Sequence, residues 1–176
     1  MKERKKQRLP DFDYGRPGWY FVTSCVKNSF YPLSVLSNAV SGESINIVGN
    51  GRDRSLQLTE TGKIIDDRIN WLQNQYECAE IDEYIIMPDH VHIIIVRNCD
   101  IVRNGRDRSL QNKIKPLPEL MGAFKTTSSK LIRQNIDPSF SWQKSYHDRI
   151  IRNDDELNRI RMYIRNNPAN YKYKEC

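Results

Sequence analysis

The sequence predicts one α+β domain, a ferredoxin-like sandwich in which helices pack on a mainly antiparallel sheet. Two apolar, strand-like runs are separated only by Pro88-Asp89, and amphipathic helical patterns lie on both sides of that pair. The length of 176 residues is typical of one domain. We expect this domain over 14–170, with a basic N-terminal tail over 1–13 and a C-terminal tail over 171–176.

Each element of the N-terminal half has its own pattern. Aromatic and β-branched residues over 19–26 follow a Gly-Arg-Pro-Gly turn and predict the first strand. Apolar residues recur at helical spacing over 59–76, where Thr59 offers a capping side chain, so we expect a helix there, with room for one more strand before it. The runs 81–87 and 90–97 predict the central pair of strands, because Pro-Asp favours a turn and interrupts a strand.

The C-terminal half predicts two helices with a strand between them. An amphipathic pattern begins at Pro116 and ends at Asp137-Pro138, and extended sequence follows over about 142–151. A last helix begins at 153–156, where three acidic side chains suit the positive end of the helix dipole, and we expect Pro168 to end it.

Composition excludes disordered and membrane-spanning classes of protein. The chain carries 28 Lys and Arg against 22 Asp and Glu, a net charge of +6, with 38% hydrophobic residues and a mean hydropathy of −0.72. No apolar run approaches the roughly 20 residues that cross a bilayer. Residues 2–8 hold five cations and one anion, a tail that is either solvated or follows phosphates. No apolar stretch follows this tail, so we expect no secretory signal and no membrane partner.

The spacing of the cysteines indicates the cellular compartment of the protein. Cys25, Cys78, Cys99 and Cys176 are widely spaced and form no C-x-x-C pair. We therefore expect a reduced, cytoplasmic protein with incidental thiols, and neither a disulfide scaffold nor a zinc knuckle.

One peptide occurs twice. Residues 47–57 recur as 101–111 with a single difference. Asn-Gly and Arg-Asp-Arg-Ser leave little to bury, so we expect both copies in exposed loops or hairpin tips, as insertions near 43–57 and 99–115.

The DNA that encodes this peptide can be palindromic. Residues 49–55, with the first base of the next codon, can be written GGGAACGGTCGCGACCGTTCCC, which is its own reverse complement. We hypothesise that a mobile palindromic element entered the gene twice, in frame, at tolerant loops. The alternative is two copies of an arginine-rich loop that contacts DNA. Codons in the gene that fail to pair across Arg52-Asp53 would contradict the insertion.

Two of the three histidines form His90-Val91-His92 at the start of an apolar strand. Side chains two residues apart in a strand point to the same face, roughly 7 Å apart along the strand, so both imidazoles can share a metal ion. The alternative is a pair of histidines that only satisfy hydrogen bonds within the fold.

The last helix adds a hydroxyl and a carboxamide. Tyr163 and Asn167 lie one turn apart on the flank of its apolar stripe. A divalent ion on the two histidines and Asn167 would polarise a phosphodiester, and Tyr163 would attack phosphorus as the covalent nucleophile. A phosphotyrosine ester conserves the bond energy, so a strand can be cut and rejoined without ATP. The alternative is a packing tyrosine and an asparagine near a helix end, both of which are common.

Three sequence segments, taken together, form a specific family signature. Met-Pro-Asp-His-Val-His at 87–92, Trp-Gln-Lys-Ser-Tyr-His-Asp-Arg at 142–149 and Tyr-Ile-Arg-Asn-Asn-Pro at 163–168 resemble, in order and spacing, the motifs of single-tyrosine HUH transposases. The chain is most similar to the branch called REP-associated tyrosine transposases, over about 14–170. This resemblance implies a ferredoxin-like nuclease that needs Mg²⁺ or Mn²⁺, cleaves single-stranded DNA near a palindromic hairpin through a 5′-phosphotyrosine intermediate, and acts as a homodimer associated with the nucleoid.

The resemblance also assigns roles to residues. His90 and His92 match the metal-binding pair, and Tyr163 matches the nucleophile. Asn167 stands where the mobile transposons carry Gln, four residues after the tyrosine. The duplicated palindrome is then a candidate for the enzyme's own kind of substrate.

Several further side chains are candidates for DNA contacts, namely Lys125, Lys130, Trp142, Tyr146, His147, Arg149 and Arg152. Trp142 can instead anchor the core, and His147 can instead hydrogen-bond within the fold. Two other functions stay open. One is a non-catalytic DNA-hairpin-binding protein on the same fold, and the other is a structural zinc domain that uses His90, His92 and His147 and unfolds with chelators.

Overall fold

The computed structural model describes residues 12–27, 32–38, 54–99 and 115–171. Its main sheet is antiparallel, with strand order β4-β5-β1-β6. These strands are β1 (Gly18–Cys25), β4 (Ala79–Ile86), β5 (His90–Arg97) and β6 (His147–Ile151). A separate antiparallel pair consists of β2 (Ser34–Asn38) and β3 (Arg54–Leu58).

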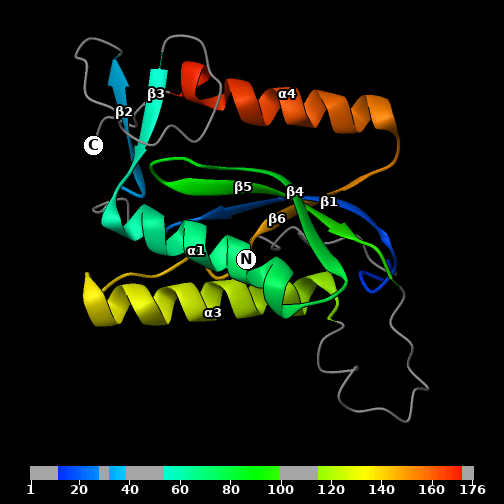
Figure 1. Cartoon of the computed structure of the whole chain (residues 1–176), viewed down its shortest axis with the longest axis horizontal. Helices are drawn as coiled ribbons and strands as arrows, with labels where there is room; N and C mark the ends of the chain where they lie inside the picture. Colours follow the sequence, from blue (N-terminus) through cyan, green and yellow to red (C-terminus); the bar gives the residue numbers. More distant parts are fainter. Residues whose placement is uncertain (1–11, 28–31, 39–53, 100–114, 172–176) are drawn as a thin grey trace, which may run out of the picture.

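The helices cover both faces of the main sheet. They are α1 (Glu60–Gln75), α3 (Leu117–Asn135) and α4 (Asp154–Asn170). Helices α1 and α3 pack together on one face, whereas α4 lies across the other face, beside the β2–β3 pair (Figure 1). The order β1-α1-β4-β5-α3-β6 with this strand arrangement is that of a ferredoxin-like domain, to which α4 adds a third layer. The predicted α+β class is confirmed. In the described ranges, no helix is both long and apolar enough to span a bilayer.

Strand β5 is buried on both faces, which explains its continuous apolar run. Ile93 and Ile95 pack with Phe124 in the core beneath α1 and α3. Ile94 packs with Ile164 in a second core beneath α4. The first residues of β5 lie at the end of this second core, and they carry the histidine pair.

Two helix starts are capped by side chains, as predicted for Thr59, and one helix end does not follow the prediction. Thr59 caps α1 by accepting a hydrogen bond from the Gly62 N–H at 3.2 Å, and Asn153 caps α4 by accepting one from the Glu156 N–H at 2.8 Å. Pro168 does not end α4, which continues to Asn170. A proline so close to the helix end removes only one backbone hydrogen bond, so the helix can continue past it.

The prediction of incidental thiols is wrong for two cysteines. Cys78 and Cys99 form a disulfide, with their Cα atoms 5.6 Å apart. Antiparallel pairing places Ala79 opposite Arg97 at the ends of β4 and β5, which brings the flanking cysteines together. Their separation of 21 residues concealed this proximity in the sequence.

The first copy of the duplicated peptide is not simply an exposed loop. Its last residues belong to β3, and Leu56 is 3% exposed because it packs with Leu36 and Ile164 in the core beneath α4. The remainder of this copy, 47–53, and the whole second copy, 101–111, lie outside the described residues.

Gly62 lies where the first turn of α1 meets the chain before β2. A Cβ at this position would come within 2.0 Å of the Leu33 carbonyl oxygen, which also accepts the Thr59 N–H at 3.1 Å. We expect Gly62→Ala to lower the free energy of unfolding by about 2–3 kcal/mol, measured by urea denaturation, because neither backbone can move without breaking this junction. Gly122→Ala is the matched control in α3, since a Cβ there meets nothing within 4 Å. It should instead stabilise by roughly 0.5–1 kcal/mol, and equal effects would contradict the packing described.

Candidate active site

The two histidines of β5 lie side by side on the face of the sheet that α4 covers. His92 pairs with Thr23 of β1 and His90 pairs with Cys25. Their rings lean toward each other, so that the Nε2 atoms are 3.1 Å apart. The two Nε2 atoms therefore share a hydrogen bond and lie close enough together to face a single point.

The other nitrogen of each ring has its own partner. Asp89 Oδ1 lies 2.6 Å from His90 Nδ1, and Thr23 Oγ1 lies 2.8 Å from His92 Nδ1. Such partners fix the orientation and tautomer of a metal-binding imidazole. Because the carboxylate accepts the Nδ1 proton of His90, the Nε2 atom of that ring keeps its lone pair.

The two imidazoles differ in burial. His92 is 5% exposed, and burial lowers its pKa to about 3, with a further lowering by His90 and a partial offset by Asp89. The ring of His92 is therefore neutral at physiological pH and able to act as a ligand.

This burial predicts a pH dependence of stability. As pH falls from about 6.5 toward 3, the unfolded metal-free chain binds a proton on His92 that the folded chain does not. We expect the free energy of unfolding to fall in that window, by at most about 1.4 kcal/mol per pH unit from this group, and the contribution to be constant above it. Urea denaturation in EDTA, from neutral pH to about pH 5, should show a steeper loss for the wild type than for His92→Gln. A slope that is the same in the wild type and in His92→Gln would contradict this prediction.

Tyr163 of α4 lies over the buried histidine. Its hydroxyl is 3.4 Å from His92 Nε2, and its ring packs against Phe21 and His92 with centroid distances of 6.1 Å and 5.3 Å. The side chain is 52% exposed, so a substrate can reach the hydroxyl from solvent. The structure thus brings an accessible hydroxyl from α4 to the histidine pair of the sheet on which this helix packs.

Asn167 follows one turn later on the same helix and is 8% exposed. Residues four apart share one helix face, so Asn167 lies on the face of α4 that carries Tyr163. Tyr171, the residue directly after this helix, lies with its ring 6.3 Å from that of His90. In the described part of the chain, no hydrogen bond engages the Asn167 carboxamide.

Ion pairs fix the orientation of α4 on the sheet. Arg161 binds Asp82 through two nitrogens and lies over the Trp19 ring, 5.6 Å from its centroid. Arg165 forms a bidentate pair with Glu83, at 2.8–3.1 Å. Both carboxylates lie at the irregularity in β4 where the register shifts. These contacts hold the helix with Tyr163 toward His92.

The predicted DNA contacts separate into different environments. Trp142 is 7% exposed and donates to Ser128 Oγ at 3.0 Å, and Tyr146 is 6% exposed in the same core. Both rings are largely buried, so Trp142 anchors the core, although it also lines a pocket together with Lys125 and Lys130. His147 is exposed on β6, and Arg149 pairs with Glu156.

The remaining three predicted contacts are also surface positions or pocket walls. Arg152 is exposed beside the start of α4. Lys125 and Lys130 line a pocket on the other side of the sheet. Of the predicted side chains, Lys125, Lys130 and Trp142 therefore share one pocket, whereas His147, Arg149 and Arg152 lie outside it.

A structural zinc site does not assemble from the three histidines. Thr23 of β1 pairs with His92 on one side and with His147 on the other, so the two histidines are separated by an intervening strand, roughly 10 Å. Over the residues that the structure describes, no group of three His, Cys, Asp or Glu side chains is placed to hold a metal ion. The histidine pair thus lacks a third ligand of these types there.

Comparisons with known proteins add to this geometry. No family model matches the chain. The chain is 28% identical to an uncharacterized protein of Haemophilus influenzae, over 96% of this chain and 89% of that protein. A candidate transposase of Deinococcus radiodurans is similar in structure, with 14% identity and a TM-score of 0.49 over 93% of this chain and 95% of the other.

A second solved structure decides the fold. A REP-associated tyrosine transposase bound to a REP hairpin aligns with 99% of this chain and 76% of its own length, with a TM-score of 0.59 and 17% identity. The chain therefore shares the fold of a REP-associated tyrosine transposase. Within this transposase fold, the segments 87–92 and 163–168 meet at the histidine pair, and 142–149 leads into the edge strand β6.

Sequence reasoning missed four residues of this site. Thr23 and Asp89 hold the imidazoles, and Phe21 and Tyr171 pack against them. Asp89 was detectable, because it directly precedes His90. Thr23 lies 69 residues from His92, and only the pairing of β1 with β5 brings it close.

Proposed function

We propose that this chain is a metal-dependent, single-strand DNA endonuclease and strand transferase that cleaves and rejoins DNA at palindromic, REP-like hairpins, as in DNA transposition. The observation that carries the proposal is the position of the Tyr163 hydroxyl, 3.4 Å from an imidazole whose Nε2 converges with that of His90. An exposed hydroxyl beside two fixed nitrogen donors suits phosphoryl transfer through a covalent tyrosine ester.

The donor set fits a divalent ion. The Nε2 atoms of His90 and His92 lie 3.1 Å apart, close enough that both would hold one divalent ion. Both Nδ1 atoms are engaged by Asp89 and Thr23, which leaves Nε2 of each ring for the metal. Asn167 would supply a carboxamide oxygen from α4. Bound there, Mg²⁺ or Mn²⁺ would stabilise the negative charge that develops on the phosphate.

The chain's own groups account for the covalent step. The Tyr163 oxygen attacks phosphorus and loses its proton to solvent, which reaches the half-exposed side chain. The P–O bond to the 3′ oxygen breaks, that oxygen takes a proton from solvent and leaves as a 3′ hydroxyl, and the phosphate remains as a 5′-phosphotyrosine. Attack by a 3′ hydroxyl on this ester reverses the step and frees Tyr163, so no ATP is consumed.

The hairpin assignment rests on two further supports. The transposase of similar fold is bound to a REP hairpin, and the chain's duplicated peptide can itself be encoded by a perfect palindrome. We propose that the substrate is a single strand containing such a hairpin, bound by a homodimer at the nucleoid. The palindrome of residues 49–55 supplies the probe.

A covalent-trapping experiment tests this function. The full chain is incubated with Mn²⁺ or Mg²⁺ and labelled single strands that carry the palindrome, with scrambled strands as the control. We expect a protein–DNA adduct that survives denaturation, with the nucleotide mapped to Tyr163 by mass spectrometry. Binding without an adduct would instead support the non-catalytic hairpin-binding protein, and equal binding of scrambled DNA would contradict the hairpin assignment.

A further inference from the structure

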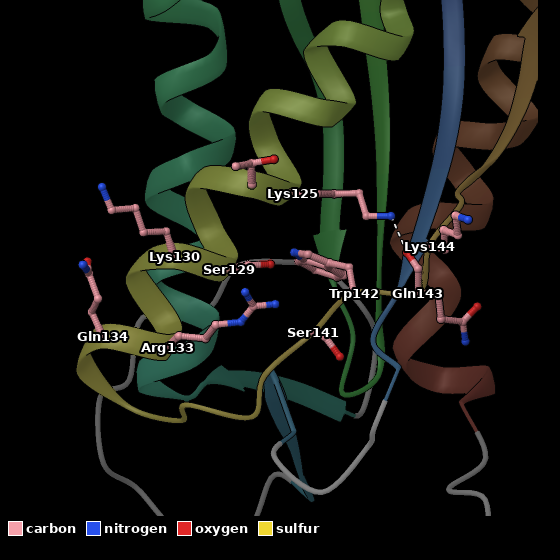
Figure 2. Close-up of a pocket in the computed structure, with 10 residues that line it drawn as sticks. Lys125, Ser129, Lys130, Arg133, Gln134, Ser141, Trp142, Gln143 and Lys144 are labelled. Carbon is pink, nitrogen blue, oxygen red and sulfur yellow. Dashed lines mark hydrogen bonds between the residues drawn. The ribbon is translucent and has the colours of Figure 1, made fainter.

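A basic pocket lies on the side of the sheet opposite Tyr163. It has a volume of about 540 Å³ and opens between α3 and the segment 141–144 (Figure 2). Cations from both walls line it, namely Lys125, Lys130 and Arg133 from α3 and Lys144 from the facing segment, and no lining residue is acidic. The pocket therefore presents positive charge from two walls.

These cations have no carboxylate partner among the described residues. In the part of the chain that the structure describes, none of the four forms an ion pair, whereas Arg149, Arg161 and Arg165 on the α4 side each bind a carboxylate. Hydroxyl groups of Ser129 and Ser141 also line the pocket. Unpaired cations together with hydroxyl donors are the groups that bind phosphate oxygens.

Hydrogen bonds from Lys125 and Arg133 hold the walls of the pocket together. Lys125 Nζ donates to the backbone carbonyls of Gln143 and Ser145, and burial lowers the pKa of this amine. Arg133 donates through Nε to the Phe140 carbonyl at 2.7 Å, and within the described residues its two terminal amino groups form no hydrogen bond. Lys125 thus holds the facing segment in place, while Arg133 and the exposed Lys144 offer charge to a ligand.

The facing wall is hydrogen-bonded to the end of the sheet that carries the catalytic pair. The Gln143 N–H donates to the Cys25 carbonyl at 2.8 Å, and Cys25 pairs with His90. The Lys27 N–H donates to the Ser141 carbonyl at 2.9 Å, and Lys27 itself is exposed at this end of β1. The pocket and the active site therefore lie on opposite faces of the same sheet end, with a cation between them.

We propose that this pocket binds backbone phosphates of the single strand that flanks the hairpin, so that the strand crosses the end of the sheet between the pocket and Tyr163. The inference rests on the proposed function for the identity of the strand. Duplex DNA is stiff over such distances and cannot turn around one sheet end, whereas a single strand bends at each nucleotide. The unpaired strand, and not the stem, is thus the occupant.

Binding without catalysis tests this assignment. Fluorescence anisotropy in EDTA measures the affinity of the full chain for the palindromic hairpin alone and for the hairpin with a 5′ or a 3′ single-stranded flank. We expect Arg133→Gln/Lys144→Gln to weaken binding of one flanked probe about tenfold and to reduce its salt slope by roughly 1.5, since each lost contact to a single strand accounts for about 0.7. Binding of the hairpin alone should not change.

Matched variants distinguish loss of the pocket cations from loss of the same net charge elsewhere on the protein. Lys63→Gln/Lys115→Gln removes the same charge from residues that pair with Glu60 and Glu119 outside the pocket, and it should bind both probes as the wild type does. Arg133→Lys, which keeps the charge, should recover most of the affinity. Inorganic phosphate is added as a competitor, to test whether the pocket binds free anions and not the strand.

The outcomes are distinguishable. The inference would be overturned if the pocket and control variants lost affinity equally, or if the pocket variant bound both flanked probes as the wild type does. It would also be overturned if inorganic phosphate bound the pocket without weakening binding of the strand. The Tyr163 adduct is measured on the same proteins with Mn²⁺. If the pocket variant forms the adduct and binds the strand normally, the pocket proposal is wrong and the proposed function stands. If strand binding depends on the pocket but no adduct forms, the proposed function is wrong and the pocket proposal stands.

Discussion

Tyr163→Phe is expected to abolish the covalent protein–DNA complex and strand cleavage, by a factor on the order of 10⁴ or more, while hairpin binding and stability are retained. The substitution removes only the hydroxyl, whose contact with His92 Nε2 is 3.4 Å, and keeps the ring packed against Phe21. Because the side chain is half exposed, the free energy of unfolding should change by less than about 0.5 kcal/mol. Gel analysis of denatured reactions measures the adduct, and anisotropy measures binding.

Tyr171→Phe is the matched control for this variant. Tyr171 directly follows α4, with its ring 6.3 Å from that of His90, so it is the alternative nucleophile that the geometry offers. It should leave the adduct intact. An adduct that persists in Tyr163→Phe and disappears in Tyr171→Phe would reassign the nucleophile, and one that persists in both would refute tyrosine catalysis by this helix.

Features of the site that depend on local periodicity were predictable from the sequence. Alternation along a strand places His90 and His92 on one face whatever the rest of the fold does. The apolar stripe of the last helix turns Tyr163 toward the edge of that stripe, and the structure places its hydroxyl beside His92. The convergence of the two Nε2 atoms to 3.1 Å was not contained in the pattern, because ring orientation depends on Thr23 and Asp89.

Features that depend on contacts distant in the sequence were not predictable. The disulfide of Cys78 with Cys99 follows from strand register, and the burial of Leu56 follows from the position of the β2–β3 pair beside α4. The ion pairs that hold α4 join Arg161 to a carboxylate 79 residues earlier. The burial of Trp142 was decided by its neighbours in three dimensions, since an aromatic residue between polar ones gives no local indication of burial.

His90→Ala is expected to remove most of the metal affinity and, with it, cleavage. His90 is the better test of the pair, because His92 is fully packed in the fold and its loss would also destabilise the protein. Changing a residue that only orients a ligand costs 10–100-fold in metal affinity, so removing a ligand itself should cost at least about 100-fold. Titration with Mn²⁺, followed by electron paramagnetic resonance and by cleavage rate, measures both effects.

Asp89→Asn tests the orientation of the His90 ring by Asp89 separately from metal binding by that ring. Its carboxylate holds His90 Nδ1 at 2.6 Å, so the variant should lose roughly 10–100-fold in affinity and recover cleavage when more Mn²⁺ is added. His90→Ala should not recover over the same range, because one of the two nitrogen donors is missing. If His90→Ala cleaved the hairpin strand at the wild-type metal concentration, or if EDTA left cleavage of the wild type unchanged, the imidazole pair could not be the metal site. Tyr163 would then act through the fixed charge of the protein alone, and the basic groups of this sheet end would have to stabilise the transition state in place of the ion.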